Sequence, residues 1–478
     1  MITDLKPYPA YKGSDSKWLG AVPAMWEVRN LRTLISKRAE RNRADLPLLS
    51  VAREKGVFIR SLTDVDENHN VIPEDLSNYK VARAGNLVIN KMKAWQGSMG
   101  IAPCDGIVSP AYYVFDFRIA NHAFGQKLLR SKPYVAHFGQ ASDGVRVGQW
   151  DLSIPGMRQI PVLVPPPDEQ AAIVRYLDWT NGRLERAIRA KRKVIALLNE
   201  ERQAIIHRAV TRGLDPSVPL KQSGIPWLVD IPQHWEGRRL SSICSIIVDG
   251  THFSPRNDTA GDYLYITAKS IKERGVDVSS ATYVSASAHR EIYQRCPVRK
   301  GDVLYIKDGA TAGLATVNNL EDEFSMLSSV ALLRPRPSVA TPDFLALALN
   351  DSVFKQHALS CVVGGAMTRF TVALLKRFSI VMPPLAEQEH IVSTVSDEVR
   401  PLRASETKLE REIELLREFR TRLVADVVTG KLDVRAAAAK LPDESPEPEL
   451  LDDGDILTED DEETGDADLD AVPEETEA

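Results

Sequence analysis

Apolar residues recur every seven positions along residues 383–433, near the C-terminal end of the chain. The positions are Val395, Leu402, Leu409, Leu416 and Leu423, with Ile413 four residues after Leu409. Spacings of seven and four residues place side chains on one face of an α-helix, which is the pattern of a coiled-coil seam. A helix of this length with one apolar face is not stable alone, so the pattern predicts a partner for that face.

Residues 165–215 carry a second seam of the same kind. Its positions are Leu177, Leu184, Ile188, Ile195, Leu198 and Ile205. The two segments align without a gap, so that the pair Glu169-Gln170 falls on Glu387-Gln388. An internal repeat of this size indicates two similar halves, each ending in a long helix.

The two seams differ where each is imperfect, because Lys191 of the first aligns with Leu409 of the second. This difference favours antiparallel pairing of the two helices with each other, with one globular domain at each end. The alternative is that each helix packs on its own domain. Gly182 and Pro401 fall at adjacent aligned positions, which predicts a break or kink that splits off a short helix bearing the Glu-Gln pair.

Two segments of mixed character precede the two helices. Residues 26–164 and 236–382 contain short β-rich runs separated by Gly, Pro, Asn and Asp turns. Each also has a helical stretch, near residues 123–138 and 342–360. The expected fold class is α+β, with two globular mixed α/β domains separated by two long helices. We expect the helices to form an antiparallel coiled coil, and the halves to be related by a pseudo-twofold internal repeat.

Residues 1–25 are a proline- and lysine-bearing arm, and residues 216–235 repeat this arm as a linker. Each copy holds two tryptophans that flank a proline. They are Trp18, Trp26, Trp227 and Trp235. Large aromatic side chains of this kind anchor a segment on a core more often than they stack on a ligand. We therefore expect the arms to be pinned to the domains that follow them.

The net charge of −6 conceals an uneven distribution, because residues 441–478 contain 18 acidic residues and no lysine or arginine. The rest of the chain is therefore basic. We expect residues 434–478 to form an acidic, disordered tail. A basic body is compatible with a polyanionic partner, and an ordinary mixed surface is the alternative.

Motifs for catalysis are absent from the sequence, which has no Gly-rich phosphate loop, zinc-protease motif or nucleophile elbow. The four cysteines and nine histidines are scattered without metal-ligand spacing. The sequence also shows no signal peptide and no apolar run long enough to span a membrane. We expect no catalytic residue, no bound metal, no membrane association and a cytoplasmic location.

The order of the motifs carries a resemblance to a known family. A Trp-Leu-x-x-x-Pro-x-x-Trp lead-in is followed by a variable domain with a Gly-Asp-x-Leu strand and by a Pro-Pro-x-x-Glu-Gln helix, and the arrangement occurs twice. Over residues 5–433 the chain resembles the DNA-specificity subunits of type I restriction–modification systems.

This resemblance implies that each variable domain is a target-recognition domain that reads one half of a split site in double-stranded DNA. The paired helices would set the gap between the half-sites and dock two methyltransferase subunits, which carry S-adenosylmethionine. Restriction/translocase subunits would join the complex for cleavage. No cofactor is then expected on this chain itself.

Base and phosphate contacts require basic or amide side chains in accessible loops. Residues 90–97 and 142–149 fit in the first domain, and residues 307–313 and 364–369 fit in the second. The candidate DNA-contacting residues are Lys91, Lys93, Trp95, Gln96, Arg146, Gln149, His252, Arg256, Lys269, Lys307, Thr368 and Arg369. The seam residues named above are the candidates for subunit docking.

Two other functions are compatible with parts of this pattern. The chain could be a protein-interaction scaffold with two binding domains on a coiled-coil rod, or a self-sufficient modification enzyme. The basic balance of the body favours a DNA-binding subunit over the scaffold. The absence of catalytic motifs argues against the enzyme.

Overall fold

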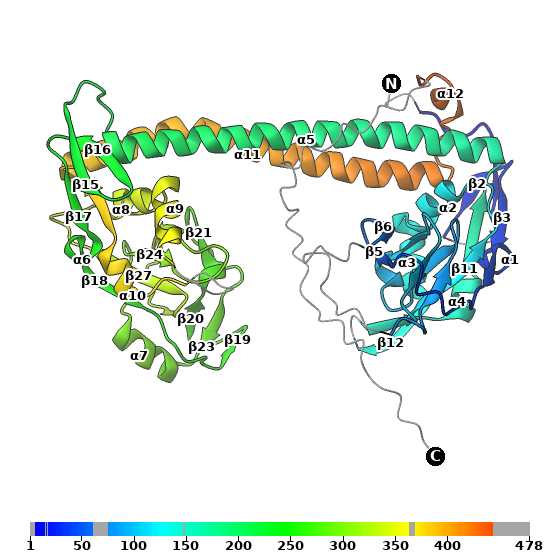
Figure 1. Cartoon of the computed structure of the whole chain (residues 1–478), viewed down its shortest axis with the longest axis horizontal. Helices are drawn as coiled ribbons and strands as arrows, with labels where there is room; N and C mark the ends of the chain where they lie inside the picture. Colours follow the sequence, from blue (N-terminus) through cyan, green and yellow to red (C-terminus); the bar gives the residue numbers. More distant parts are fainter. Residues whose placement is uncertain are drawn as a thin grey trace, which may run out of the picture. The chain divides into compact units, whose positions relative to one another are not determined.

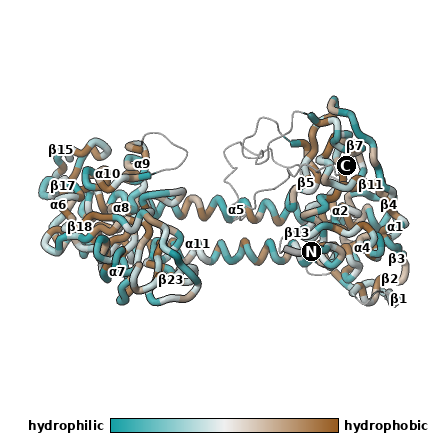
Figure 2. The backbone as a smooth tube through the Cα atoms, turned by 90° about the horizontal axis from the view of Figure 1, so that it is seen from below, coloured by the Kyte–Doolittle hydropathy of each residue, from teal (hydrophilic) through white to brown (hydrophobic). Residues whose placement is uncertain are grey.

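The computed structural model describes residues 5–442 except 15, 17, 61–74, 147–148 and 363–368. The chain divides into two compact units. Unit 1 comprises Met1–Ala190 and Glu412–Ala478, and unit 2 comprises Lys191–Arg411. Both boundaries lie inside the long helices, so each unit contains a part of both. Figure 2 shows hydrophobic residues gathered inside each unit.

Unit 1 is built on a four-stranded antiparallel sheet with helices packed against it (Figure 1). In spatial order the strands are β4 (Ile35–Lys37), β11 (Tyr112–Phe117), β8 (Leu87–Asn90) and β9 (Met99–Ile101). Helices α2 (His122–Leu129) and α3 (Lys132–Gln140) share one hydrophobic core with this sheet. β8 begins with Leu87, Val88 and Ile89, which are all fully buried, as a short continuous apolar run predicts for a central strand.

Small strand pairs and short helices complete unit 1. The strand pairs are β1 (Tyr11–Gly13) with β2 (Ala21–Pro23), β3 (Glu27–Asn30) with β14 (Pro161–Val164), β5 (Leu49–Ala52) with β6 (Gly56–Ile59), β7 (Lys80–Ala82) with β10 (Gly106–Val108), and β12 (Ser142–Arg146) with β13 (Gln149–Leu152). The short helices are α1 (Leu31–Leu34), η1 (Ala94–Gln96) and α4 (Ile154–Arg158).

Unit 2 repeats this frame. Its corresponding antiparallel sheet has the order β18 (Cys244–Asp249), β27 (Val330–Pro335), β24 (Val303–Ile306) and β25 (Ala315–Val317). The helices equivalent to α2 and α3 are α8 (Pro342–Leu349) and α9 (Ser352–Ser360). The pairs β15 (Leu220–Ile225) with β16 (Leu228–Pro232) and β17 (Glu236–Arg239) with β28 (Ser379–Met382) correspond to β1 with β2 and β3 with β14.

Other elements of unit 2 have no counterpart in this frame. A second sheet has the order β19 (Asn257–Asp258), β23 (Thr282–Val284), β20 (Tyr263–Ile266) and β26 (Ser325–Met326). The other elements without a counterpart are η2 (Ala268–Ser270), β21 (Ile271–Lys272), β22 (Gly275–Val276) and α7 (Ala286–Arg295). Helix α6 (Leu240–Ile243) follows β17 and α10 (Val372–Arg377) precedes β28, as α1 follows β3 and α4 precedes β14 in unit 1. The mixed α and β content predicted from the sequence is therefore present in both units.

Each helical stretch expected in the domains is divided into two helices. In residues 123–138 the division has a clear cause, because Pro133 lies in the first turn of α3. Proline lacks an N–H group and disfavours a helical conformation in the residue before it. In residues 342–360 the second helix begins after Asp351, whose side chain accepts a hydrogen bond from Phe354 N as an N-cap.

The two long helices are α5 (Pro167–Arg212) and α11 (Leu385–Val428), and each is continuous (Figure 1). The expected break at Gly182 and Pro401 is therefore wrong, and no short Glu-Gln helix is split off. An internal proline removes one backbone hydrogen bond of the helix. Around Pro401 this loss is offset by packing, because Val395 and Val399 are buried in the core of unit 2.

Within each unit the two long helices run antiparallel. In unit 1, Glu185 of α5 forms an ion pair with Arg420 of α11. In unit 2, Asn199 Nδ2 donates to Glu406 Oε1 over 3.1 Å. Glu185, in the first half of α5, thus meets a late residue of α11, whereas the later Asn199 meets an earlier residue of α11. This agrees with the expected antiparallel pairing.

The predicted seam residues all lie on the sheltered side of the helices. Those that are buried are Leu177, Leu184, Ile188, Val395, Ile413 and Leu423. Those of intermediate exposure are Ile195, Leu198, Ile205, Leu402, Leu409 and Leu416. By contrast, the neighbouring residues Val194, Leu197, Leu415 and Phe419 are exposed. The heptad pattern therefore distinguishes the sheltered apolar residues from the exposed ones.

The Glu-Gln pair attaches the start of α5 to the body of unit 1. Trp26 Nε1 donates to Glu169 Oε1 over 2.9 Å. Gln170 Nε2 donates to the carbonyl of Pro165 over 2.8 Å, and Gln170 Oε1 accepts from Asn121 N over 2.9 Å. Glu169 and Gln170 are almost inaccessible to solvent, so these hydrogen bonds satisfy polar groups that water does not reach.

The same attachment occurs at the start of α11 in unit 2. Trp235 Nε1 donates to Glu387 Oε2 over 3.0 Å. Gln388 Nε2 donates to the carbonyl of Pro383 over 2.8 Å, and Gln388 Oε1 accepts from Thr341 N over 2.9 Å. Trp26 and Trp235 are both fully buried, which confirms that they are core residues.

The N-terminal arm contacts the end of α11 as well as the domain that follows it. Asp433 N donates to the carbonyl of Lys6 over 2.8 Å. Beyond it, α12 (Arg435–Ala438) packs into the core of unit 1 through the buried Val434 and Ala438. The expectation that the tail begins at residue 434 is therefore wrong for residues 434–442, because apolar contacts order them. Residues 443–478 lie outside the described residues.

We predict that Gln388→Ala destabilises unit 2. The substitution leaves the buried carbonyl of Pro383 and the N–H of Thr341 without these partners, at a cost of about 1–3 kcal/mol. Urea unfolding, followed by tryptophan fluorescence, measures the loss. Gln233→Ala is the matched control because the Gln233 side chain is exposed. Equal midpoints for the two variants would contradict the attachment role.

Candidate nucleic-acid interface

In unit 1 the structure brings together the two loops that the sequence singled out. Leu152 N, in β13, donates to the carbonyl of Lys91 over 2.9 Å. The ammonium of Lys91 also lies 3.2 Å from Asp151 Oδ2. The loop after β8 therefore lies against the β12–β13 hairpin. Asp151 was not identified from the sequence, because its partner lies 60 residues away.

Aromatic side chains hold the loop after β8 in place. Trp95 Nε1 donates to the carbonyl of Met92 over 3.0 Å, and the ring centroid of Trp95 lies 5.1 Å from that of Trp150. Both rings are partly buried, so Trp95 supports the loop and keeps a part of its surface accessible. Lys93 and Gln96 lie on the same turn and are also partly buried.

Arg146 and Gln149 lie opposite each other in the β12–β13 hairpin, where they form the register pair next to the turn. Their side chains are outside the described residues, so only their backbone positions are assigned. These positions are on the hairpin that touches the Lys91 loop.

Unit 2 repeats the same junction. Phe370 N donates to the carbonyl of Lys307 over 2.8 Å, which matches the bond from Leu152 N to the carbonyl of Lys91. Asp308 and Arg369 form an isolated antiparallel bridge beside it. The loop after β24 and the segment before α10 therefore meet as their counterparts do in unit 1. Thr368 lies outside the described residues.

A buried carboxylate connects three of the basic residues of unit 2. Asp249 lies at the end of β18, where Oδ1 is 2.7 Å from Arg295 Nη2. Its Oδ2 is 3.1 Å from His252 Nε2 and 3.6 Å from Lys307 Nζ. The sequence had indicated His252 and Lys307. It did not indicate Asp249 or Arg295, because no local motif links them.

A second carboxylate extends this network to Arg369. Asp308 Oδ2 lies 3.1 Å from Lys307 Nζ, and Asp308 Oδ1 lies 3.6 Å from Arg369 Nε. The Lys307 side chain is only 5% exposed, so its charge faces two carboxylates of the protein. The structure therefore does not support Lys307 as a direct DNA contact, because its ammonium is enclosed within the fold.

Exposed basic side chains border this buried network. The side chains of His252, Arg295 and Arg369 are 56%, 54% and 71% exposed. Because Asp308 meets Arg369 through Nε, both Nη groups of that guanidinium remain directed elsewhere. A guanidinium edge of this kind can bind a phosphate or the O6 and N7 atoms of guanine.

Close backbone packing fixes the position of Asp249. A Cβ atom at Gly250 would lie only 2.1 Å from the carbonyl oxygen of Met326, so any larger residue would force the two chains apart. Thr251 is buried next to it and pairs with Leu327 in a parallel bridge. The glycine therefore allows β18 to end against β26.

The two remaining basic candidates of unit 2 are separate from this network. Arg256 and Lys269 are exposed, and no hydrogen bond or ion pair among the described residues joins them to Asp249 or Asp308.

Cys296, which follows Arg295, is buried, and burial raises its pKa to about 12. This thiol therefore stays protonated and is a poor nucleophile.

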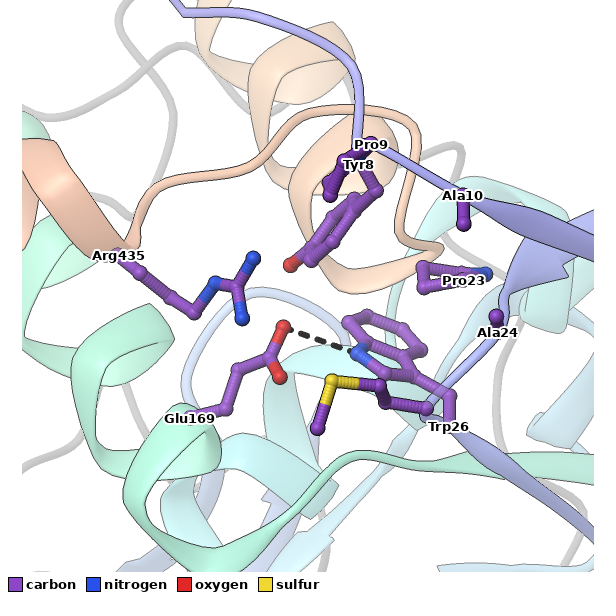
Figure 3. A pocket seen from close by; sticks show the side chains of 9 residues that line it. Tyr8, Pro9, Ala10, Pro23, Ala24, Trp26, Glu169 and Arg435 are labelled. Atoms are coloured by element: carbon purple, nitrogen blue, oxygen red, sulfur yellow. Dashed lines mark hydrogen bonds between the residues drawn. The ribbon is translucent and has the colours of Figure 1, made fainter.

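Unit 1 also contains a small pocket, between the N-terminal arm and the start of α5 (Figure 3). Tyr8, Trp26, Glu169 and Arg435 contribute to its lining. The guanidinium carbon of Arg435 lies 5.2 Å from the ring centroid of Tyr8. Burial and then the nearby Glu169 carboxylate raise the pKa of Tyr8, so its phenol stays protonated. The Arg435 guanidinium thus lies at this pocket, and its contacts help to attach α12 to the rest of unit 1.

Among the described residues, no group of three or more His, Cys, Asp or Glu side chains is arranged to hold a metal ion. No helix there combines the length and apolar character needed to cross a membrane.

Comparison with known proteins finds similarity to one family over part of the chain. Residues 232–415 match the model of the type I restriction modification DNA specificity domain. The specificity subunit of the type I restriction enzyme EcoKI from Escherichia coli (strain K12) is 23% identical over 207 residues, which are 42% of this chain and 44% of that protein. The EcoBI specificity subunit from Escherichia coli is 24% identical over 243 residues, which are 48% of this chain and 50% of that protein. The chain thus spans at most half the length of these relatives.

A solved structure shares the fold over most of the chain. It is a chain of a type I R-M system, studied for complex assembly and conformational transition. The match has a TM-score of 0.60 and 18% identity, and covers 86% of this chain and 99% of that chain. The sequence matches are thus to type I restriction enzyme specificity subunits, and the structural match shows that the fold is shared.

We predict that Asp249→Asn destabilises unit 2, whereas Arg369→Ala does not. Removing the Asp249 charge leaves Lys307 buried with one fewer anion, and breaking a buried ion pair costs about 3–5 kcal/mol. Arg369 is exposed, so its truncation changes stability by about 0.5 kcal/mol or less. Thermal unfolding measures the difference: the melting temperature should fall in Asp249→Asn and stay close to that of the wild type in Arg369→Ala. Equal melting temperatures would show that Asp249 contributes no more to stability than the exposed Arg369 does.

Proposed function

We propose that this chain is the DNA-specificity subunit of a type I restriction–modification complex. Each unit carries one target-recognition domain, which reads one half of a bipartite site in double-stranded DNA. The observation that carries this proposal is the repeated junction at the carbonyls of Lys91 and Lys307. The same backbone frame presents a tryptophan-supported loop in unit 1 and an arginine-rich charged network in unit 2. Two domains that share a backbone frame but differ in their loop side chains suit a DNA site whose two halves differ in sequence.

The long helices are the proposed spacer and docking surface. They would form an antiparallel coiled coil that sets the gap between the half-sites. The sheltered seam residues already pack against other residues of their own unit, so the exposed apolar residues of the helices suit docking of a partner subunit better. These are Val194 and Leu197 in unit 2, and Leu415 and Phe419 in unit 1, with exposures of 45%, 54%, 47% and 39%.

The partners would supply the chemistry that this chain lacks. Two methyltransferase subunits would bring S-adenosylmethionine and modify the site, and restriction/translocase subunits would join them. This chain would then be non-catalytic, bind no cofactor and act in the cytoplasm. The support is the absence of a catalytic motif in the sequence together with the match of residues 232–415 to the specificity-domain model.

Binding of duplex DNA by this chain with its methyltransferase partner tests the proposal. The logarithm of the affinity should fall linearly with the logarithm of the salt concentration, because phosphate contacts release counterions. Arg146→Ala and Arg369→Ala should each weaken recognition of a different half-site by about 1–3 kcal/mol. Wild-type methylation rates in both variants would show that these loops are not the readers. Absent or salt-insensitive binding would favour the protein-interaction scaffold.

The spacer role predicts the effect of a longer helix pair. Because Asn199 meets Glu406, seven residues inserted after Leu198 need a matching heptad after Glu406 to keep the pairing in register. Seven residues add about 10 Å of helix, and one base pair spans about 3.4 Å. The gap should therefore widen by about three base pairs, with both half-sequences unchanged. Mapping of methylated adenines measures the gap, and an unchanged value would rule out the spacer role.

A further inference from the structure

One acidic side chain of unit 2 touches both long helices. Glu273 lies in the turn between β21 and β22. Its Oε1 accepts hydrogen bonds from Arg202 Nη1 of α5 over 2.6 Å and from Arg403 Nη2 of α11 over 2.5 Å. A single carboxylate oxygen therefore links the domain to two helices that are far apart in sequence.

The turn that carries Glu273 is itself held firmly by the domain. Ile271 and Val276 on either side of the turn are buried in a hydrophobic core. Val276 N donates to Asn319 Oδ1 over 3.0 Å. Gly275 has a φ of +127°, and a Cβ atom there would lie 2.9 Å from Asn319 Oδ1, so the turn requires glycine at this position. A displacement of Glu273 therefore requires a displacement of the domain.

The arginines are fixed on the helix side. The side chains of Arg202 and Arg403 are only 13% and 29% exposed. Arg202 Nη2 donates to Asn199 Oδ1 over 2.7 Å, and Asn199 Nδ2 donates to Glu406 Oε1 over 3.1 Å. The hydrogen-bonded chain thus runs from the domain to α5 and across to α11. Both helices hold Glu273 in one position.

The charges make this contact selective for an ionised carboxylate. Burial opposes ionisation of Glu273, but Arg202 and Arg403 outweigh burial and lower its pKa. Glu273 is therefore ionised at neutral pH. A neutral side chain at this position would leave the two guanidinium groups facing each other without a counter-ion.

The position along the helix gives Glu273 its mechanical effect. The Gln388 attachment is at the N-terminal end of α11, and Arg403 lies about 22 Å further along that helix at about 1.5 Å per residue. His207, whose Nδ1 is 3.1 Å from Asp351 Oδ1, provides another contact between α5 and the domain. Glu273 therefore holds the two helices at a point beyond the attachments at Gln388 and His207.

We propose that Glu273 is a positioning residue that fixes the angle between the unit 2 recognition domain and the two helices, and so determines how strictly the gap between half-sites is enforced. The inference rests on the proposed DNA-specificity function. Glu273 itself reads no base. It limits the range of positions from which the exposed residues of its domain can reach DNA.

The test is methylation by the complete methyltransferase complex on duplexes whose half-site gap is the preferred length or one base pair longer or shorter. Glu273→Gln should raise methylation at the two altered gaps about tenfold relative to the wild type, on the scale of a lost charge-assisted hydrogen bond. Methylation at the preferred gap should stay within about twofold, because the attachments at Gln388 remain. Glu321→Gln is the matched control, since Glu321 pairs with Lys300 on the exposed surface.

A second variant separates positioning from a general loss of folding. Arg403→Gln should relax the gap as Glu273→Gln does, and the double variant should add little, because both changes break one contact. If Glu273→Gln discriminates against the altered gaps as strongly as the wild type and Glu321→Gln do, the positioning role is wrong. The proposed DNA-specificity function would still stand. A wild-type complex that methylates all gaps equally would overturn the proposed function as well.

Discussion

A buried glutamine at the start of each long helix is the constraint on which the arrangement within each unit depends. Gln170 and Gln388 each bind a proline carbonyl before the helix and a backbone N–H of the domain, and the neighbouring glutamate binds a buried tryptophan indole. Both glutamines, both tryptophans and Glu169 are almost inaccessible to water, so few orientations of the first helical turn satisfy all of these hydrogen bonds. The direction of each long helix relative to its own domain follows from that turn.

The repeated frame separates the geometry of recognition from its chemistry. In both units a backbone N–H from a later segment binds the carbonyl of a lysine at the end of a central strand, Lys91 or Lys307. The side chains around this bond differ completely. Unit 1 packs two tryptophans there, whereas unit 2 buries Asp249 and Asp308 under exposed arginines. Loops can therefore change what they contact while the sheet and its helices stay the same.

The sequence predicted the features that are local or periodic. The heptads identified the sheltered residues of both long helices, and the repeat identified both pairs of loops that meet at the junctions. Features that depend on long-range packing could not be predicted. Lys307 looks like an accessible loop lysine, but Asp249, which is distant in sequence, encloses it. Pro401 signals a break in sequence, yet the helix is continuous, with Val395 and Val399 just before the proline packed in the core of unit 2. The DNA-contacting residues themselves stay predictions.

The contact between the N-terminal arm and the end of α11 has a consequence for biosynthesis. Unit 2 is one continuous segment, whereas unit 1 needs residues from both sides of it. As the chain leaves the ribosome, unit 2 can be completed while Ile173 and Leu177 of unit 1 still lack Leu423 and Val427, with which they share a core. The first half to be made is therefore the last to be finished. Until the C-terminal part of α11 is made, the apolar side chains of Ile173 and Leu177 lack the partners that cover them in the finished unit.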